Sequence, residues 1–95
     1  PCRDRTCVSA QIEGTVEAVE LTVYDLTGRA VFRTDRFELH EVGAAGSERS
    51  ALTVEWSARD HHGDEVANGT YLYRLEVRGP AGRSRSDMGR VVVMR

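Results

Sequence analysis

Apolar and polar residues alternate with a period of two in four separate parts of the chain, residues 8–12, 19–24, 52–56 and 71–77. Successive side chains of a β-strand point to opposite faces, so each part is expected to form a strand with one buried and one solvated face. No part repeats its apolar residues with the period of 3.6 that an amphipathic helix requires. About seven short strands separated by turn residues predict an all-β fold, an antiparallel β-sandwich.

Turn residues separate the expected strands. The stretch from Asp25 to Gly28 predicts a tight hairpin, because Gly28 can adopt the positive φ that a side chain resists. In the polar stretch after residue 56, Asp60 is expected to accept backbone N–H groups of its own loop while Gly63 permits the chain to reverse. Asn68 and Gly69 carry the strongest short signal for a hairpin turn, just before the strand that begins near Tyr71.

Two further segments differ from the alternating strands. Residues 91–94 are apolar at every position, which predicts a strand in the middle of a sheet. Residues 41–50 are rich in glycine, alanine and serine and lack any period, which predicts a mobile surface loop.

The size and charge of the chain limit what it can do. Its 95 residues suit one domain, residues 1–95. The formal net charge is −2 and both signs are scattered, so no basic face for nucleic acid or anionic lipid is expected. No apolar run approaches the roughly 20 residues that span a bilayer, which predicts no transmembrane segment. Because the chain begins at Pro1, we expect it to be the C-terminal part of a longer protein.

The two cysteines leave the redox compartment open. Cys2 and Cys7 have four residues between them, and on a continuous strand this spacing sends the side chains to opposite faces. A disulfide therefore needs a turn at residues 3–6. Two free thiols and a disulfide are both compatible with the sequence.

The sequence offers no arrangement of residues typical of an enzyme. None of the serines lies in a strand-turn-helix elbow that would activate it as a nucleophile. Oxygen atoms of Asp60, Asp64 and Asn68 are of the type that calcium binds, but the loop lacks the alternating acids that wrap the ion. No catalysis and no cofactor are expected, with calcium in this loop as the alternative.

The paired histidines and the aromatic residues could each be either binding residues or ordinary structural residues. His61 and His62 are neighbours whose side chains diverge on an extended segment, so a solvated pair is expected in place of a metal chelate. Trp56, Tyr71 and Tyr73 could form a sugar-binding platform. Alternation places all three inward, which favours core packing.

The combined order of these motifs resembles a known family. Trp56, then Asp60-x-x-Gly63, then Asn68-Gly69-x-Tyr71 is similar to the immunoglobulin-like domain of the flagellar hook-capping protein and to the C-terminal sorting domains of the type IX secretion pathway. Residues 23–31 resemble the first hairpin of these domains, and residues 89–95, with Arg90, resemble their closing strand. Within the type IX group, residues 59–71 particularly resemble the C-terminal domain of the pathway's surface protease.

The resemblance implies an immunoglobulin-like sandwich without catalysis, which directs a larger bacterial protein through type IX export to the cell surface or the medium. Its implied partners are the outer-membrane export machinery or a neighbouring domain of the parent protein. The alternatives are a structural spacer or retained accessory domain beside a peptidase or glycoside hydrolase domain, and an assembly module of the hook-capping type. The implied recognition and turn residues are Asp25, Gly28, Arg29, Trp56, Asp60, Gly63, Asp64, Asn68, Gly69, Tyr71 and Arg90.

Overall fold

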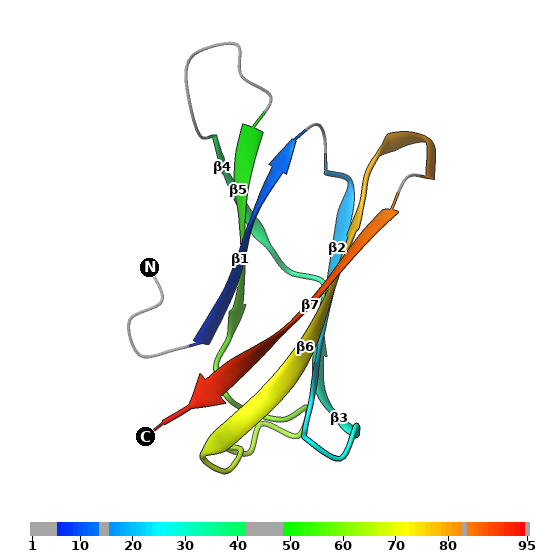
Figure 1. The fold of residues 1–95 in the computed structure, drawn as a ribbon. Helices are drawn as coiled ribbons and strands as arrows, with labels where there is room; N and C mark the ends of the chain where they lie inside the picture. Colours follow the sequence, from blue (N-terminus) through cyan, green and yellow to red (C-terminus); the bar gives the residue numbers. More distant parts are fainter. Residues whose placement is uncertain (1–5, 14–15, 42–48, 83, 95) are drawn as a thin grey trace.

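The structure, a computed structural model, describes residues 6–13, 16–41, 49–82 and 84–94. These parts of the chain contain seven strands and one short 3-10 helix: β1 (Thr6–Glu13), β2 (Ala18–Tyr24), β3 (Ala30–Thr34), β4 (Glu38–Glu41), β5 (Arg49–Trp56), β6 (Gly69–Arg78), η1 (Pro80–Gly82) and β7 (Ser84–Val93). One sheet has the order β1-β5-β4 and the other β3-β2-β6-β7, and every pairing is antiparallel (Figure 1). The predicted all-β, immunoglobulin-like antiparallel sandwich of about seven strands is confirmed.

The hydrophobic core lies between the two sheets, at the positions that alternation predicts. Alternate residues are buried in β2, in β5 from Leu52 onward and in β6 between Tyr71 and Val77, where Tyr73 is half-buried. Leu21, Leu52 and Val54 have no exposed surface. Burying each such side chain stabilises the fold by about 1.5–3 kcal/mol. The buried apolar residues are Val19, Leu21, Val23, Leu52, Val54, Trp56, Ala58, Tyr71, Leu75, Val77 and Val93.

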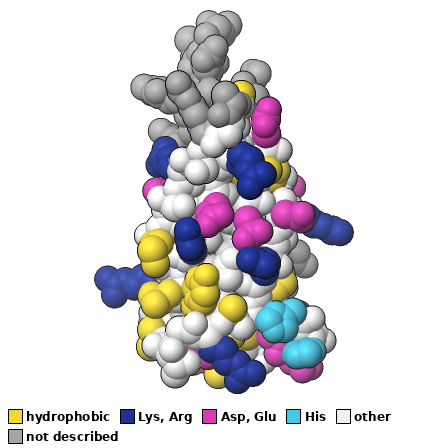
Figure 2. All heavy atoms as spheres, turned by 90° about the vertical axis from the view of Figure 1, so that its right-hand side faces the viewer, with side chains coloured by type: hydrophobic (Ala, Val, Ile, Leu, Met, Phe, Trp, Pro, Cys, Tyr) yellow, Lys and Arg dark blue, Asp and Glu magenta, His cyan; other side chains and the backbone are white. Residues whose placement is uncertain are grey.

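The opposite side of the four-stranded sheet, called here the outer face, presents most of the intervening residues to solvent, although Thr22 is buried. Arg33 on β3 pairs with Glu20 on β2 at 3.1 Å, and Arg74 pairs with Glu76 on β6 at 2.8 Å. Figure 2 shows this face with charged side chains over its middle and hydrophobic side chains gathered below them. The sheet therefore alternates between a buried and a solvated surface, as predicted.

The prediction that residues 91–94 form a central strand is wrong. They belong to the end of β7, which pairs with β6 alone among the described strands and so forms an edge of its sheet. Val92 is 55% exposed and Met94 is 83% exposed. Continuous apolar sequence thus marks the end of a long edge strand here, since hydrophobicity cannot report how many neighbours a strand has.

Residues 41–50, which were expected to form a mobile loop, overlap two strands at their ends. Glu41 ends β4, a strand that was not predicted, and Arg49 and Ser50 already belong to β5. The rest of the segment, residues 42–48, lies outside the described residues, as does Cys2. The side chain of Cys7 is not described either, so the prediction about the cysteines stays open.

Candidate recognition surface

The turn between β2 and β3 is organised by the carboxylate of Asp25. Its Oδ1 accepts the backbone N–H of Thr27 at 3.0 Å and that of Arg29 at 3.1 Å, together with the Thr27 hydroxyl. The Gly28 N–H donates to the Asp25 carbonyl at 3.0 Å, and the Asp25 N–H donates to the Arg29 carbonyl at 2.9 Å. Gly28 has φ of 91°, which only glycine adopts without strain. The predicted hairpin is confirmed, and residues 25–29 are called the Asp25 turn.

The segment between β5 and β6 contains a turn built in the same way. Oδ1 of Asp60 accepts the backbone N–H of His62 at 2.9 Å and that of Asp64 at 3.0 Å. Gly63, with φ of 87°, donates to the Asp60 carbonyl at 3.0 Å, and the Asp60 N–H donates to the Asp64 carbonyl at 2.9 Å. The predicted role of Asp60 in its own loop is confirmed. Residues 60–64 are called the Asp60 turn.

These hydrogen bonds favour the charged form of both aspartates. The Thr27 hydroxyl, followed by the backbone N–H of Arg29, holds the pKa of Asp25 below its ordinary value of 3.8. The backbone N–H of Asp64 is the largest cause that lowers the pKa of Asp60 from the same value. Each carboxylate therefore serves as a backbone acceptor while it is ionised.

The Asp60 turn is anchored to the core by two aromatic side chains. Trp56, 1% exposed, donates its indole N–H to the Arg59 carbonyl at 2.9 Å. The Tyr71 hydroxyl donates to the Ala67 carbonyl at 2.7 Å, on the other side of the turn. The two rings meet edge to face, with centroids 5.4 Å apart. Both rings are buried, so they pack in the core as predicted and do not form an open sugar-binding platform.

Further contacts close the segment on itself. The Arg59 guanidinium donates to the Gly63 carbonyl at 2.8 Å and reaches Glu65 at 3.5 Å. Val66 N–H donates to the carbonyl of Ala58, a buried residue with φ of 58°. Sequence reasoning gave no role to Ala58, because nothing in an alanine indicates a left-handed backbone.

The two turns lie at the same end of the sandwich, called the loop end, at the bottom of Figure 1. The His61 N–H donates to the Val31 carbonyl of β3 at 3.2 Å, so the Asp60 turn lies against the strand that leaves the Asp25 turn. This bond also occupies part of the edge of β3, which has only five residues. The same Asp-x-x-Gly spacing occurs in both turns, and this repeat in the sequence indicates that they are built in the same way.

The expected Asn68-Gly69 hairpin is wrong. β5 and β6 belong to different sheets, so the segment between them crosses from one sheet to the other. Gly69 is the first residue of β6, opposite Val93, and its φ of 146° falls in the region that side chains rarely adopt. Glycine is still required there, but by the start of a strand and not by a two-residue turn.

The structure therefore brings most of the predicted residues together. Asp25, Gly28 and Arg29 form one turn, and Asp60, Gly63 and Asp64 form the other. Trp56 and Tyr71 anchor the second turn from the core, with Asn68 and Gly69 at its exit. Arg90 lies elsewhere, at an outward position of β7 opposite Leu72, which is itself opposite Tyr24 of β2.

The described residues do not assemble a metal centre. No group of three or more histidine, cysteine, aspartate or glutamate side chains in this part of the chain could hold a metal ion. Oδ1 of Asp60 already accepts two backbone N–H groups, which leaves calcium at Asp60, Asp64 and Asn68 without support from the geometry. His61 and His62 are exposed, with ring centroids 5.3 Å apart in edge contact.

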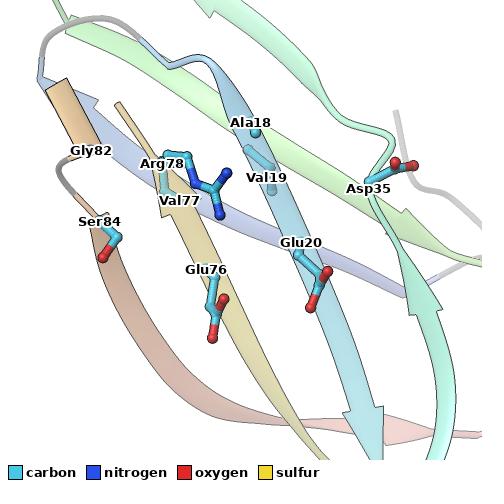
Figure 3. Close-up of a pocket in the computed structure, with 9 residues that line it drawn as sticks. All are labelled: Ala18, Val19, Glu20, Asp35, Glu76, Val77, Arg78, Gly82 and Ser84. Atoms are coloured by element: carbon cyan, nitrogen blue, oxygen red, sulfur yellow. The ribbon is translucent and has the colours of Figure 1, made fainter. Parts of the chain in front are cut away.

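A shallow hollow opens on the four-stranded sheet at the end away from the two turns. It lies over β2 and β6, where Glu20, Glu76 and Arg78 project into it, and Asp35 lies at its rim (Figure 3). Two of its acids already pair with arginines, Glu20 with Arg33 and Glu76 with Arg74. The hollow is open to solvent and lacks the convergent groups of a catalytic cleft.

Comparisons with known proteins find a likeness of fold. No protein-family model matches the chain, and no curated protein matches it. The crystal structure of CopC from Methylosinus trichosporium OB3b is similar, with a TM-score of 0.57 and 20% identity over 97% of this chain and 78% of that chain. At this identity the likeness bears on the fold alone, and it supports the β-sandwich. Within the described residues, no helix has the length and apolar character needed to cross a membrane.

Proposed function

We propose that residues 1–95 are a non-catalytic C-terminal sorting module, which directs a larger bacterial protein through type IX export to the cell surface. The resemblance of the Trp56, Asp60-x-x-Gly63 and Asn68-Gly69-x-Tyr71 motifs to sorting domains supports the proposal. Its partner is the outer-membrane export machinery, and its location is outside the cell or at the surface.

The arrangement of the two turns is the observation that carries the proposal. Each turn has a glycine at positive φ and an aspartate that binds two backbone N–H groups, and the His61–Val31 bond holds them at one end. Such internally bonded turns present the same surface in every copy without reorganising. A receptor that must recognise many unrelated cargo proteins requires a feature of this kind, and preorganisation lowers the cost of binding it.

The proposal is tested by fusing residues 1–95 to the C-terminus of a folded reporter that carries a signal peptide. The fusion is expressed in a bacterium with the type IX pathway and in the same strain lacking the outer-membrane pore. We expect reporter on the cell surface or in the medium of the first strain only, and a reporter without the domain should stay in the periplasm of both. Periplasmic retention of the fusion in both strains would contradict the proposal.

A structural spacer or retained accessory domain beside a peptidase or glycoside hydrolase domain is the second candidate. It is favoured by one observation, that the bonds made by Trp56, Asp60 and Tyr71 are internal to the domain. A spacer requires such rigidity but no receptor. In the reporter experiment it predicts a folded fusion that does not leave the periplasm.

A further inference from the structure

We propose that the half of the outer face nearest the loop end is a docking surface for a protein segment that presents a carboxylate between apolar side chains. The surface, called the Arg90 patch, consists of Tyr24, Leu72, Met88, Arg90 and Val92. This inference rests on the proposed sorting function and deepens it, because it names the surface and the chemistry of the partner.

The positions of these residues follow from strand register. Tyr24, Leu72 and Arg90 lie in one row across β2, β6 and β7. Met88 lies two residues before Arg90 along β7, and Val92 lies two residues after it, so all three point to the same face. Arg90 is therefore surrounded by apolar side chains along its own strand and across the sheet.

The patch exposes large apolar side chains on a sheet face whose other outward residues are mostly polar or charged. Met88 is 75% exposed, Val92 is 55% exposed and Leu72 is 37% exposed, and Tyr24 is half-buried. Figure 2 shows hydrophobic side chains gathered on the lower part of this face, below the charged ones. Contiguous apolar groups of this kind mark interaction sites, and tyrosine, methionine and arginine are enriched there.

The charges of the outer face select an acidic partner. Four arginines, Arg33, Arg74, Arg78 and Arg90, lie at the outward positions of its strands, against two glutamates, Glu20 and Glu76. The face is therefore positive, although the whole chain has a net charge of −2. Arg33 and Arg74 are paired with these glutamates, whereas Arg90 makes no ion pair within the described part of the chain.

A second copy of the chain is the less suitable occupant. Docking through the same face would bring two positive surfaces together around two arginines, which opposes association. A carboxylate in an apolar setting instead gives the Arg90 guanidinium a planar partner for two parallel hydrogen bonds, while its apolar neighbours cover Leu72, Met88 and Val92. Charge complementarity therefore commits the patch to an acidic and apolar segment of another protein.

The first test uses a soluble peptide of alternating glutamate and leucine, with a matched peptide in which lysine replaces glutamate. Each is titrated into 15N-labelled protein. We expect the acidic peptide to shift the amide signals of Leu72, Met88, Arg90 and Val92. Arg90→Glu should weaken this binding by about tenfold or more, whereas Arg36→Glu, in the connection between the sheets, should not. Equal binding of the lysine peptide, or shifts confined to other residues, would overturn the docking surface.

The second test places the same variants in the reporter fusion, after their melting temperatures show that they are folded. Arg90→Glu should lower export by about tenfold or more, and Arg36→Glu should leave it unchanged. Export of Arg90→Glu at the level of the unmodified fusion would overturn the docking surface while leaving the sorting function intact. Failure of the unmodified fusion to leave the periplasm would contradict the sorting function, and the peptide titration would then decide the docking surface by itself.

Discussion

Asp25 and Asp60, 35 positions apart, have the same structural role. Each stabilises a tight turn by accepting two backbone N–H groups with one carboxylate oxygen. Both side chains are on the surface, so water competes for them and the individual bonds are modest. Their importance lies in geometry. Each carboxylate replaces a backbone partner that the chain cannot supply inside a tight turn.

Acid should loosen both turns. The pKa of each aspartate is lowered in the folded protein, so their contribution to stability is fully present above the ordinary value of 3.8 and is lost as the pH falls through the lowered values. Melting temperatures measured from pH 7 down to acid should fall less steeply for the double variant Asp25→Asn and Asp60→Asn than for the unmodified protein. Asp35→Asn removes one negative charge outside the turns and serves as the control. Parallel slopes for the double variant and the unmodified protein would contradict the role of these carboxylates.

Gly89 is required by a neighbouring ring. A Cβ atom at this position would lie 2.5 Å from the Tyr73 hydroxyl oxygen and 2.6 Å from two ring carbons, because Tyr73 on β6 lies opposite Gly89 on β7. Gly89→Ala should therefore lower the free energy of unfolding in urea by about 1–3 kcal/mol. Combining it with Tyr73→Leu should cost less than the sum of the single changes, since the clash is then relieved. An unchanged stability of Gly89→Ala would show that the ring moves without cost.

At the scale of elements, the segment from residue 57 to residue 68 has no regular strand or helix but is bonded throughout. Trp56 holds its first part and Tyr71 its last part, and the Asp60 turn rests on β3. The segment also spans the two sheets, so it fixes how one sheet lies over the other at the loop end.

Loss of one anchor should release this segment. Tyr71→Phe removes the donor to the Ala67 carbonyl, which should lower stability by about 1 kcal/mol and increase hydrogen exchange of the amides in residues 57–68. Tyr24→Phe removes a hydroxyl from the outer face and is the matched control. If both variants exchange at the same rate in this segment, the Tyr71 hydroxyl is not an anchor.

The sequence predicts where the strands lie better than it predicts which strands pair with one another. Alternation located β1, β2, β5 and β6. In β2, β5 and β6 its apolar positions are those of the core, because alternation reports directly which side chains are buried. It missed β4, whose four residues are too few for a period, and it placed the end of β7 in the middle of a sheet. The Asn68-Gly69 signal predicts a hairpin wrongly, because a turn signal does not reveal that the flanking strands belong to different sheets. The Asp25 and Asp60 turns were predicted because their hydrogen bonds are local.

At the scale of the whole molecule, the four-stranded sheet has two different edges. β3 is short and bonded by the Asp60 turn, whereas β7 has ten residues. Its first half carries Arg85 and Asp87, which pair with each other at 3.1 Å, and its second half is apolar apart from Arg90. Charged residues protect an edge strand against unwanted pairing. The second half, in which Arg90 is the one charged residue, adjoins the loop end, so the proposed docking surface and the two turns lie at the same end of the molecule (Figure 1).

The most direct test of the sorting account is the location and C-terminal sequence of the native protein that carries residues 1–95, compared in cells with and without the type IX pore. Peptide mapping of the recovered protein gives both. The account predicts that the protein reaches the surface or the medium only when the pore is present, either cleaved before residue 1 or retaining Arg95. Recovery outside the cell in both strains, or retention in the periplasm of both, would contradict it.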